Sequence, residues 1–273
     1  MPSTLITRLK SARRSIAGRL VLTVAICAAL CGVANAQTSQ QEERPSTEAQ
    51  AGRLNVNQVV SHLTQMNRAR AQALHAYEST RVYRLEYKGF PGGRHAEMVV
   101  NVKYRAPGTK EFEVVSATGS KVVIDRVFKK LLEGEKEASE EEGQKRIAIN
   151  PENYEFTLEG YEPGPHGARY VLMLSPKTKN KYLFRGRIWV DEAQFAIVRM
   201  EGEPARNPSF WIKDTKIETV YVNVEDFWLP SLNRSMTAVR LGGHADLSIE
   251  YKDYRVTGSS PVSKVSSAAE QGR

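Results

Sequence analysis

The chain has 273 residues, with 39 Lys and Arg against 31 Asp and Glu, and only two cysteines. Five of the basic residues and both cysteines fall within residues 1–36, which contain no acidic residue. Without that segment, 237 residues remain with a small positive excess and no thiol. This composition excludes disulfides, sulfur-bound metal and a cysteine nucleophile, and it removes most of the electrostatic case for nucleic-acid binding.

Residues 1–36 have the three parts of a cleavable export signal. A basic stretch precedes an apolar run of 14 residues at 20–33, which is shorter than the roughly 20 residues that span a bilayer. Ala, Asn and Ala at 34–36 supply the small residues that signal peptidase requires, so cleavage is expected before Gln37. An uncleaved membrane anchor and lipidation at Cys31 are the alternatives.

The mature chain divides into three parts by composition. Residues 37–52 have no apolar side chain larger than alanine apart from Pro45, which predicts a disordered leader. Residues 257–273 are rich in Ser, Ala and Gly and predict a flexible tail. One folded domain is therefore expected at 53–256.

The first predicted element of that domain is a helix at 56–77, where apolar residues recur along one stripe at helical spacing. Asn55 followed by Gln58 indicates a capping box at its start. Arg70 falls on the apolar stripe, where its stem would cover apolar surface while its charge stays in water.

From residue 79 the apolar period changes to two, and three strands joined by short turns predict an antiparallel meander. A second helix with one apolar face is expected at 121–133. The charged stretch 134–146 that follows is interpreted as a solvated excursion. The apolar side chains expected to face inward from the three strands are Tyr83, Leu85, Tyr87, Ala96, Met98, Val100, Val102, Tyr104, Phe112 and Val114.

Strand patterns then continue to the end of the domain. Together with the meander they predict an α+β fold, mainly β, with one large curved antiparallel sheet of ten or eleven strands whose inner face is covered by a few helices. The later strands are expected at 153–161, 167–175, 182–191, 194–202, 209–223, 226–229, 233–241 and 244–256.

No catalytic or metal-binding pattern is present. The five histidines are scattered, without the spacing of a metal site, and the common serine-nucleophile and nucleotide-binding motifs are absent. Adjacent carboxylates at Asp191 and Glu192, and at Glu225 and Asp226, are interpreted as solvated turn charges. The sequence therefore predicts no enzyme, metal or cofactor.

One group of basic residues could contact a partner. Lys177, Lys179 and Lys181 alternate in a predicted turn, and Arg185 and Arg187 follow on the next strand. Such an array can meet anionic lipid head groups or an acidic protein, although lysines on a sheet edge also serve only to prevent aggregation. The many aromatic residues of the second half would either fill a core or line the cavity of a half-open barrel.

Two segments carry a family resemblance: IWVDEAQFAIVRMEG at 188–202 and DFWLPSLNR at 226–234. They resemble the LolA-like family of outer-membrane lipoprotein-sorting proteins, and the likeness extends over about 54–256. The resemblance implies an unclosed half-barrel with a helical lid over an apolar cavity that holds acyl chains. It also implies an arginine that gates the lid, for which Arg81 and Arg84 are both candidates.

The leading hypothesis is therefore a non-catalytic periplasmic carrier or binding protein for lipoprotein acyl chains or other lipid. The alternatives are an envelope signalling or scaffold domain of the same fold that binds a protein partner, and a hydrolase with a non-standard site. No nucleic-acid partner is expected. The residues expected to line the cavity are Tyr83, Leu85, Met98, Val100, Val102, Tyr104, Phe112, Val127, Phe128 and Leu131.

Overall fold

The structure is a computed structural model that describes most of the expected domain. The export signal, the leader and the end of the predicted tail lie outside the described residues. The described ranges are 53–139, 141–165, 167–180, 182–207, 212–240 and 242–262.

Within these ranges, ten antiparallel strands form one sheet that does not close, as the predicted half-barrel requires. The strands lie in the order β3-β2-β1-β10-β9-β8-β7-β6-β5-β4. Their bounds are β1 Leu74–Gly89, β2 Arg94–Arg105, β3 Thr109–Gly119, β4 Tyr154–Gly164, β5 Gly167–Pro176, β6 Phe184–Asp191, β7 Ile197–Pro204, β8 Ile212–Val224, β9 Phe227–Val239 and β10 Gly243–Ser259.

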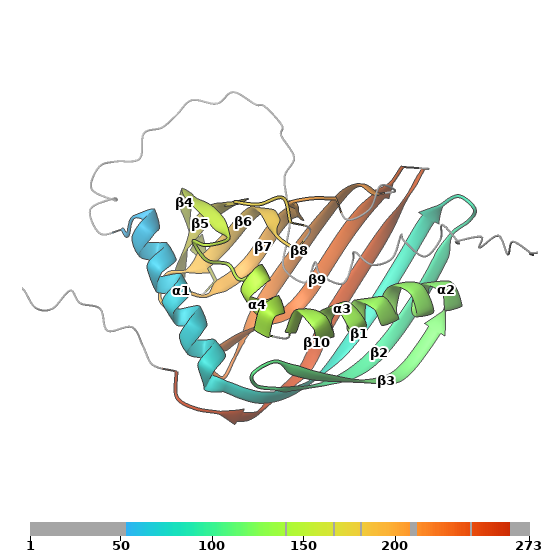
Figure 1. Ribbon diagram of the computed structural model, residues 1–273, viewed down its shortest axis with the longest axis horizontal. Coiled ribbons are helices and arrows are strands. Elements are labelled where there is room, and N and C mark those ends of the chain that lie inside the picture. The colour runs from blue at the N-terminus through green and yellow to red at the C-terminus, as the bar shows by residue number, and fades with distance from the viewer. Residues whose placement is uncertain are drawn as a thin grey trace, which may run out of the picture.

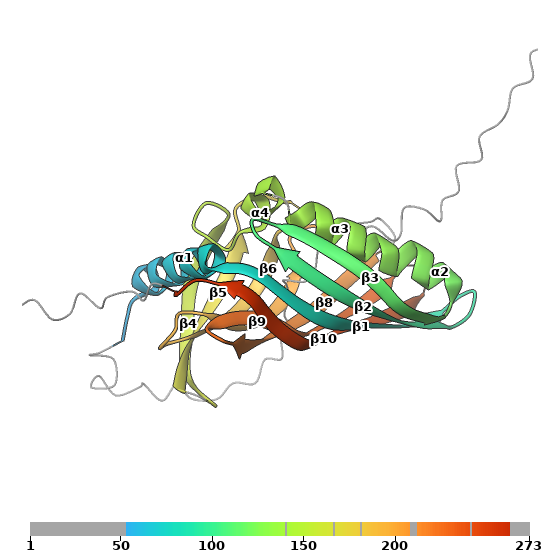
Figure 2. The ribbon, with the colours of Figure 1, turned by 90° about the horizontal axis from the view of Figure 1, so that it is seen from below.

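The sheet order explains the position of the second helical segment. Strands β3 and β4 follow one another in sequence but form opposite edges of the sheet, so their connection must cross its concave face (Figures 1 and 2). It does so as α2 (Lys121–Val123), a π-helical turn η3 (Ile124–Phe128), α3 (Lys129–Ser139) and α4 (Glu141–Ile147). We call Lys121–Ser139 the covering helices.

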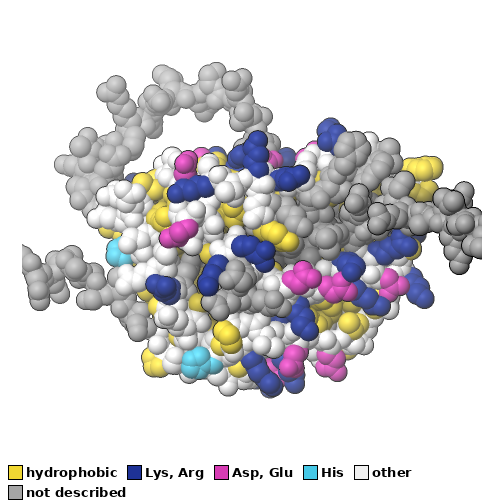
Figure 3. Space-filling model, viewed as in Figure 1, with side chains coloured by type: hydrophobic (Ala, Val, Ile, Leu, Met, Phe, Trp, Pro, Cys, Tyr) yellow, Lys and Arg dark blue, Asp and Glu magenta, His cyan; other side chains and the backbone are white. Residues whose placement is uncertain are grey.

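The charged stretch 134–146 is therefore not a solvated excursion. Helix α3 continues six residues beyond the predicted end at 133, and α4 follows directly. Lys136, Glu137, Lys145 and Arg146 of this stretch are exposed, and side chains of both signs lie on this side of the molecule (Figure 3). Another, Glu135, turns inward and contacts the sheet.

Helix α1 (Val56–Ala73) begins as predicted, with reciprocal hydrogen bonds between Asn55 and Gln58 that confirm the capping box. It ends at Ala73 rather than at Tyr77, because Leu74 adopts an extended conformation and opens β1. Leu74 and Tyr77 fit both a helical and a strand pattern, and pairing with β10 decides between them.

The prediction that Arg70 keeps its charge in water is wrong. Its side chain is buried, and its guanidinium donates hydrogen bonds to the carbonyl oxygens of Gln194 and Phe195 in the β6–β7 turn. Burial lowers the pKa of Arg70, while the charges of Asp191 and Asp226 oppose that shift. Arg70 thus anchors α1 to the turn.

We expect Arg70→Ala to lower the free energy of unfolding by about 2 kcal/mol, because two carbonyls of the turn lose a charged donor in part-buried hydrogen bonds. Arg70→Lys, which keeps the charge but cannot reach both oxygens as a planar fork, should lose less. Urea unfolding of both variants measures the difference. Unchanged stability of Arg70→Ala would show that water satisfies the turn equally well.

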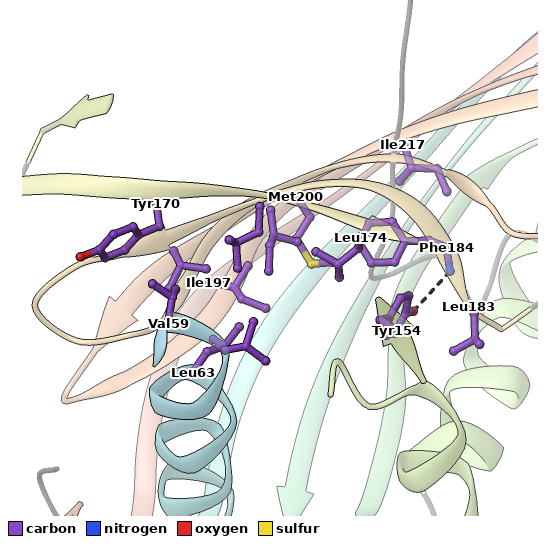
Figure 4. Close-up of a cluster of buried hydrophobic side chains, with 14 residues drawn as sticks. Val59, Leu63, Tyr154, Tyr170, Leu174, Leu183, Phe184, Ile197, Met200 and Ile217 are labelled. Carbon is purple, nitrogen blue, oxygen red and sulfur yellow. Dashed lines mark hydrogen bonds between the residues drawn. The ribbon is translucent and has the colours of Figure 1, made fainter. Parts of the chain in front are cut away.

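Two apolar clusters fill the concave side. In the first, Val59 and Leu63 of α1 pack against β4–β8, where the backbone N–H of Phe184 donates to the Tyr154 hydroxyl at 3.3 Å (Figure 4). In the second, the covering helices pack on β1, β2 and β10. No helix among the described residues is both long and apolar enough to cross a membrane.

Three strand predictions need adjustment. Segments 226–229 and 233–241 belong to one strand, β9. Strand β10 runs to Ser259, which pairs with Leu74, so it includes the first residues of the segment assigned to a tail. Val114 pairs with Val100 and shares its face, but it is half exposed because β3 is a sheet edge.

Candidate functional site

The register of four adjacent strands places side chains in rows across the concave face. Opposed residues of antiparallel strands share a face, and each row lies two residues from the next. The row nearest the rim is Arg94, Tyr87, Ala245 and Thr237; then follow Ala96, Leu85, Leu247 and Ser235; then Met98, Tyr83, Ile249 and Asn233; and then Val100, Arg81 and Tyr251.

A groove of about 350 Å³ lies between the two outer rows and the covering helices. Most of its lining residues are apolar, and Leu85 and Leu247 on its floor and Val123 on its helical wall are buried. The residues that line it are Leu85, Tyr87, Phe90, Pro91, Arg94, Val122, Val123, Arg126, Val127, Ile212, Ser235, Thr237, Val239, Ala245 and Leu247.

The mouth of the groove has an exposed apolar rim. Phe90, at the tip of the β1–β2 hairpin, is 81% exposed, and Val122 on the facing helix is 49% exposed. Arg94 and Arg126, both exposed, flank the same opening. Large exposed apolar side chains beside an apolar groove are typical of a binding site rather than of a close-packed core.

One side of the groove, formed by β9, carries hydroxyl groups. Thr237 lies 3.1 Å from Thr215, oxygen to oxygen, in a buried hydrogen bond. Ser235 is 3% exposed, and its hydroxyl has no hydrogen-bond partner in the structure. A buried hydroxyl without a partner is costly, and this one lies beside the groove.

A cluster of three ionised side chains lies on the same face of the sheet, two rows deeper than the groove. Arg81 is 2% exposed; its Nη1 lies 2.6 Å from Oε2 of Glu135, and Lys110 Nζ lies 2.7 Å from the other carboxylate oxygen. The guanidinium also lies over the ring of Tyr251, 4.8 Å from its centroid. Arg81 lies six positions before Tyr87 of the outermost row, so the cluster lies about 20 Å from the rim.

This cluster connects the sheet to the covering helices, because Arg81 belongs to β1, Lys110 to β3 and Glu135 to α3. Burial alone would raise the pKa of Glu135, but the two cations overcome it and lower that pKa from 4.5 to about 2. Burial raises the pKa of the neighbouring Tyr83 to about 12, so its hydroxyl stays protonated. The carboxylate is therefore fully charged at neutral pH.

Of the two arginines considered for a lid contact, Arg81 reaches the covering helices and Arg84 does not. Arg84 points to the opposite face of the sheet and forms ion pairs with Glu97 and Glu250. Side chains alternate between the two faces along β1, and odd-numbered residues in this part of the strand face the concave side. Arg81 and Arg84 therefore lie on opposite faces.

The ten predicted cavity residues divide into three groups. Leu85 and Val127 line the groove. Tyr104 is half buried, stacks on Tyr77 and belongs to a different apolar cluster. The others pack in or against the closed cluster beneath those helices: Tyr83, Met98, Val100, Val102, Phe112, Phe128 and Leu131.

Most of the groove was not predicted from the sequence. Arg94 and Arg126 were not singled out because each is one arginine among many. Ala245 and Ser235 were missed because their place beside β1 depends on the strand order. Once the order of the strands in the sheet is known, the alternation of side chains between its two faces identifies these residues.

The predicted basic array is partly engaged within the chain. Lys177 donates to the carbonyl of Pro151, and Arg187 forms an ion pair with Glu159. Lys181 lies outside the described residues. A partner role for the array, including Lys179 and Arg185, remains a prediction.

Asp191 is not a solvated turn charge, as the sequence suggested. It is buried, and its Oδ1 accepts the backbone N–H groups of Ala193 and Gln194. Glu192 accepts a hydrogen bond from the Tyr161 hydroxyl. Both carboxylates therefore fix the β6–β7 turn. Among the described residues, no three His, Cys, Asp or Glu side chains are grouped so that they could hold a metal.

No family model and no curated protein matches the sequence. Solved structures resemble the chain at low identity. An outer-membrane lipoprotein-sorting domain from Vibrio parahaemolyticus is 13% identical, with 74% of this chain and 94% of that chain covered and a TM-score of 0.37. A LolA superfamily protein from Nitrosomonas europaea is 11% identical, with coverages of 78% and 99% and a TM-score of 0.31.

A complex of MucB with MucA from Pseudomonas aeruginosa is also similar, at 10% identity, with coverages of 74% and 100% and a TM-score of 0.23. These identities and TM-scores are too low to transfer a ligand or a partner to this chain. The fold class rests on the sheet of the chain itself.

Proposed function

We propose that the protein binds the apolar chain of a lipidic or acylated ligand in the groove beneath the covering helices. It would act without catalysis, as a periplasmic carrier or binding protein exported by the signal at 1–36. The observation that carries this proposal is the apolar groove of about 350 Å³ with its exposed rim. That volume lies in the usual range for ligand sites.

Burial of apolar surface would supply the binding free energy. Each methylene group that leaves water contributes about 0.8 kcal/mol, and the lining offers few polar groups to interrupt a hydrocarbon chain. The exposed Phe90 and Val122 would themselves lose water contact when a chain lies between them. An apolar ligand therefore gains from both the floor and the rim.

A longer hydrocarbon chain would require the covering helices to move, because the side chains of the deeper rows are packed against these helices. The Arg81–Glu135–Lys110 cluster is the polar contact that holds these helices over the sheet, and Arg81 is accordingly our candidate for the lid arginine. The domain that carries this activity is the one expected at 53–256.

The proposal is tested by filling the groove. Ala245 lies in the outermost row and faces the groove, so Ala245→Trp would occupy its space without displacing a packed side chain. We expect at least a tenfold loss of affinity for a fluorescent fatty-acyl probe, with an unchanged circular dichroism spectrum. Fluorescence titration measures both affinities.

Ser248→Trp is the matched control, because it lies on the same strand with its side chain on the opposite face, and it should bind the probe normally. Undiminished binding by Ala245→Trp would contradict the groove as the site. A wild-type protein that binds no acyl probe would favour the alternative function, a scaffold domain with a protein partner.

A further inference from the structure

We infer that the ligand of this groove is an anionic amphiphile whose head group, a carboxylate or a phosphate, lies between Arg94 and Arg126 at the mouth. This inference rests on the proposed function and adds the chemical class of the ligand. The two arginines come from opposite walls: Arg94 from the first residue of β2 and Arg126 from the π-helical turn η3.

The alternation of side chains along β2 places Arg94 on the face that lines the groove. It pairs with Tyr87, which pairs in turn with Ala245, and all three share the concave face in the outermost row. Arg94 differs from the deeper residues on the same face of β2, which are Ala96, Met98 and Val100. The charge therefore occurs only where the apolar face of β2 reaches water.

The positive charge at the mouth is not compensated. Within the described part of the chain, neither guanidinium forms an ion pair, and none of the residues lining the groove is acidic. By contrast, Lys129 on the same helical segment has Asp125 as a partner. Two free guanidiniums facing one apolar opening attract a negative group there, and each can bind carboxylate or phosphate oxygens through paired N–H groups.

Most of the polar groups of the groove lie at its mouth. Thr237 shares the outermost row with Arg94, and the unpartnered hydroxyl of Ser235 lies one row deeper, about 7 Å further along the strand. The floor on β1 and β10 is apolar, as is the wall of the covering helices apart from Arg126. A molecule with one charged end and one hydrocarbon end fits this division, and an uncharged hydrocarbon leaves the arginines unused.

The test compares probes that have the same chain and different head groups: dodecanoate, dodecyl phosphate and dodecanol, each below its micelle concentration, titrated calorimetrically into the purified protein. We expect the two anions to bind more tightly than the alcohol. Arg94→Gln and Arg126→Gln should each weaken anion binding about fivefold, the upper range for a partly exposed ion pair, and leave dodecanol unchanged. Raising the salt from 0.1 to 1 M should weaken only the anions, because the Debye length falls from about 10 to about 3 Å.

Arg105→Gln is the matched control, because Arg105 is an exposed arginine at the other end of β2 and should affect no probe. The ratio of dodecanoate to dodecyl phosphate affinity distinguishes a carboxylate from a phosphate ligand. Equal binding of the anions and the alcohol, or equal weakening of all probes by the arginine variants, would overturn the inference and leave the proposed function intact. Failure of all three probes to bind would overturn both.

Discussion

Glu135→Gln is expected to lower the free energy of unfolding by about 3 kcal/mol at pH 7, the lower end of the range for removing one partner of a buried ion pair. The amide keeps the shape of the side chain but leaves Arg81 and Lys110 without a counter-charge, and Arg81 is 2% exposed. The lowered pKa gives a similar figure, because a shift from 4.5 to about 2 corresponds to about 3 kcal/mol at 1.36 kcal/mol per unit. Thermal unfolding should show a decrease of about 10 °C for a domain of this size.

The stability that Glu135 contributes should decrease as the pH falls. A carboxylate with a lowered pKa stabilises the folded state above its unfolded pKa, and this contribution is lost as the pH falls through the folded value. The stability difference between wild type and Glu135→Gln should therefore be constant above pH 5 and disappear between about pH 4.5 and pH 2. Glu133→Gln, on the exposed side of α3, is the control and should cost less than 0.5 kcal/mol. A pH-independent difference would mean that Glu135 acts through packing alone.

Phe128→Ala is expected to lower the free energy of unfolding by about 3–5 kcal/mol, as other large-to-small substitutions of a buried phenylalanine do. Phe128 is fully buried at the end of η3, and its ring centroid lies 5.9 Å from that of Tyr83 in the third row. The void would lie beneath the covering helices, where the groove ends. A long acyl chain could fill it, so added ligand should raise the melting temperature of the variant more than that of the wild type.

Phe184→Ala provides the matched comparison. Phe184 is equally buried, but it lies in the cluster beneath α1. Its loss should cost about the same and leave the ligand-induced shift at the wild-type value. If a long-chain ligand stabilises the two variants equally, the covering helices do not lie on the path of the chain.

The features predicted correctly are those that depend on local pattern. The capping box at Asn55 follows from four residues of sequence, and the inward face of β2 follows from strict alternation through Met98, Val100 and Val102. The apolar side chains of the second helix pack on the sheet, so its predicted face was also correct. Local chemistry suffices for each of these features.

The features that were missed depend on the order of strands in space. Adjacency of β1 to β10 places Ala245 beside Tyr87, although 157 residues separate them in the chain. The separation of β3 from β4 is bridged by a connection over the concave face, and this crossing brings α3 and its Glu135 against the sheet. No pattern within a single segment carries this information.

The two free edges of the sheet differ in how they are protected. Along β4, a register shift between Leu158 and Gly160, a proline at 163 and several glutamates discourage another strand from pairing. The outer half of β3, Val114 to Gly119, has neither a charge nor a proline, and Val115 is 57% exposed. Such uncharged segments with high strand propensity are where chains begin to aggregate. The unclosed barrel therefore lowers colloidal stability. In concentrated solution, intermolecular strand pairing is expected to begin at β3.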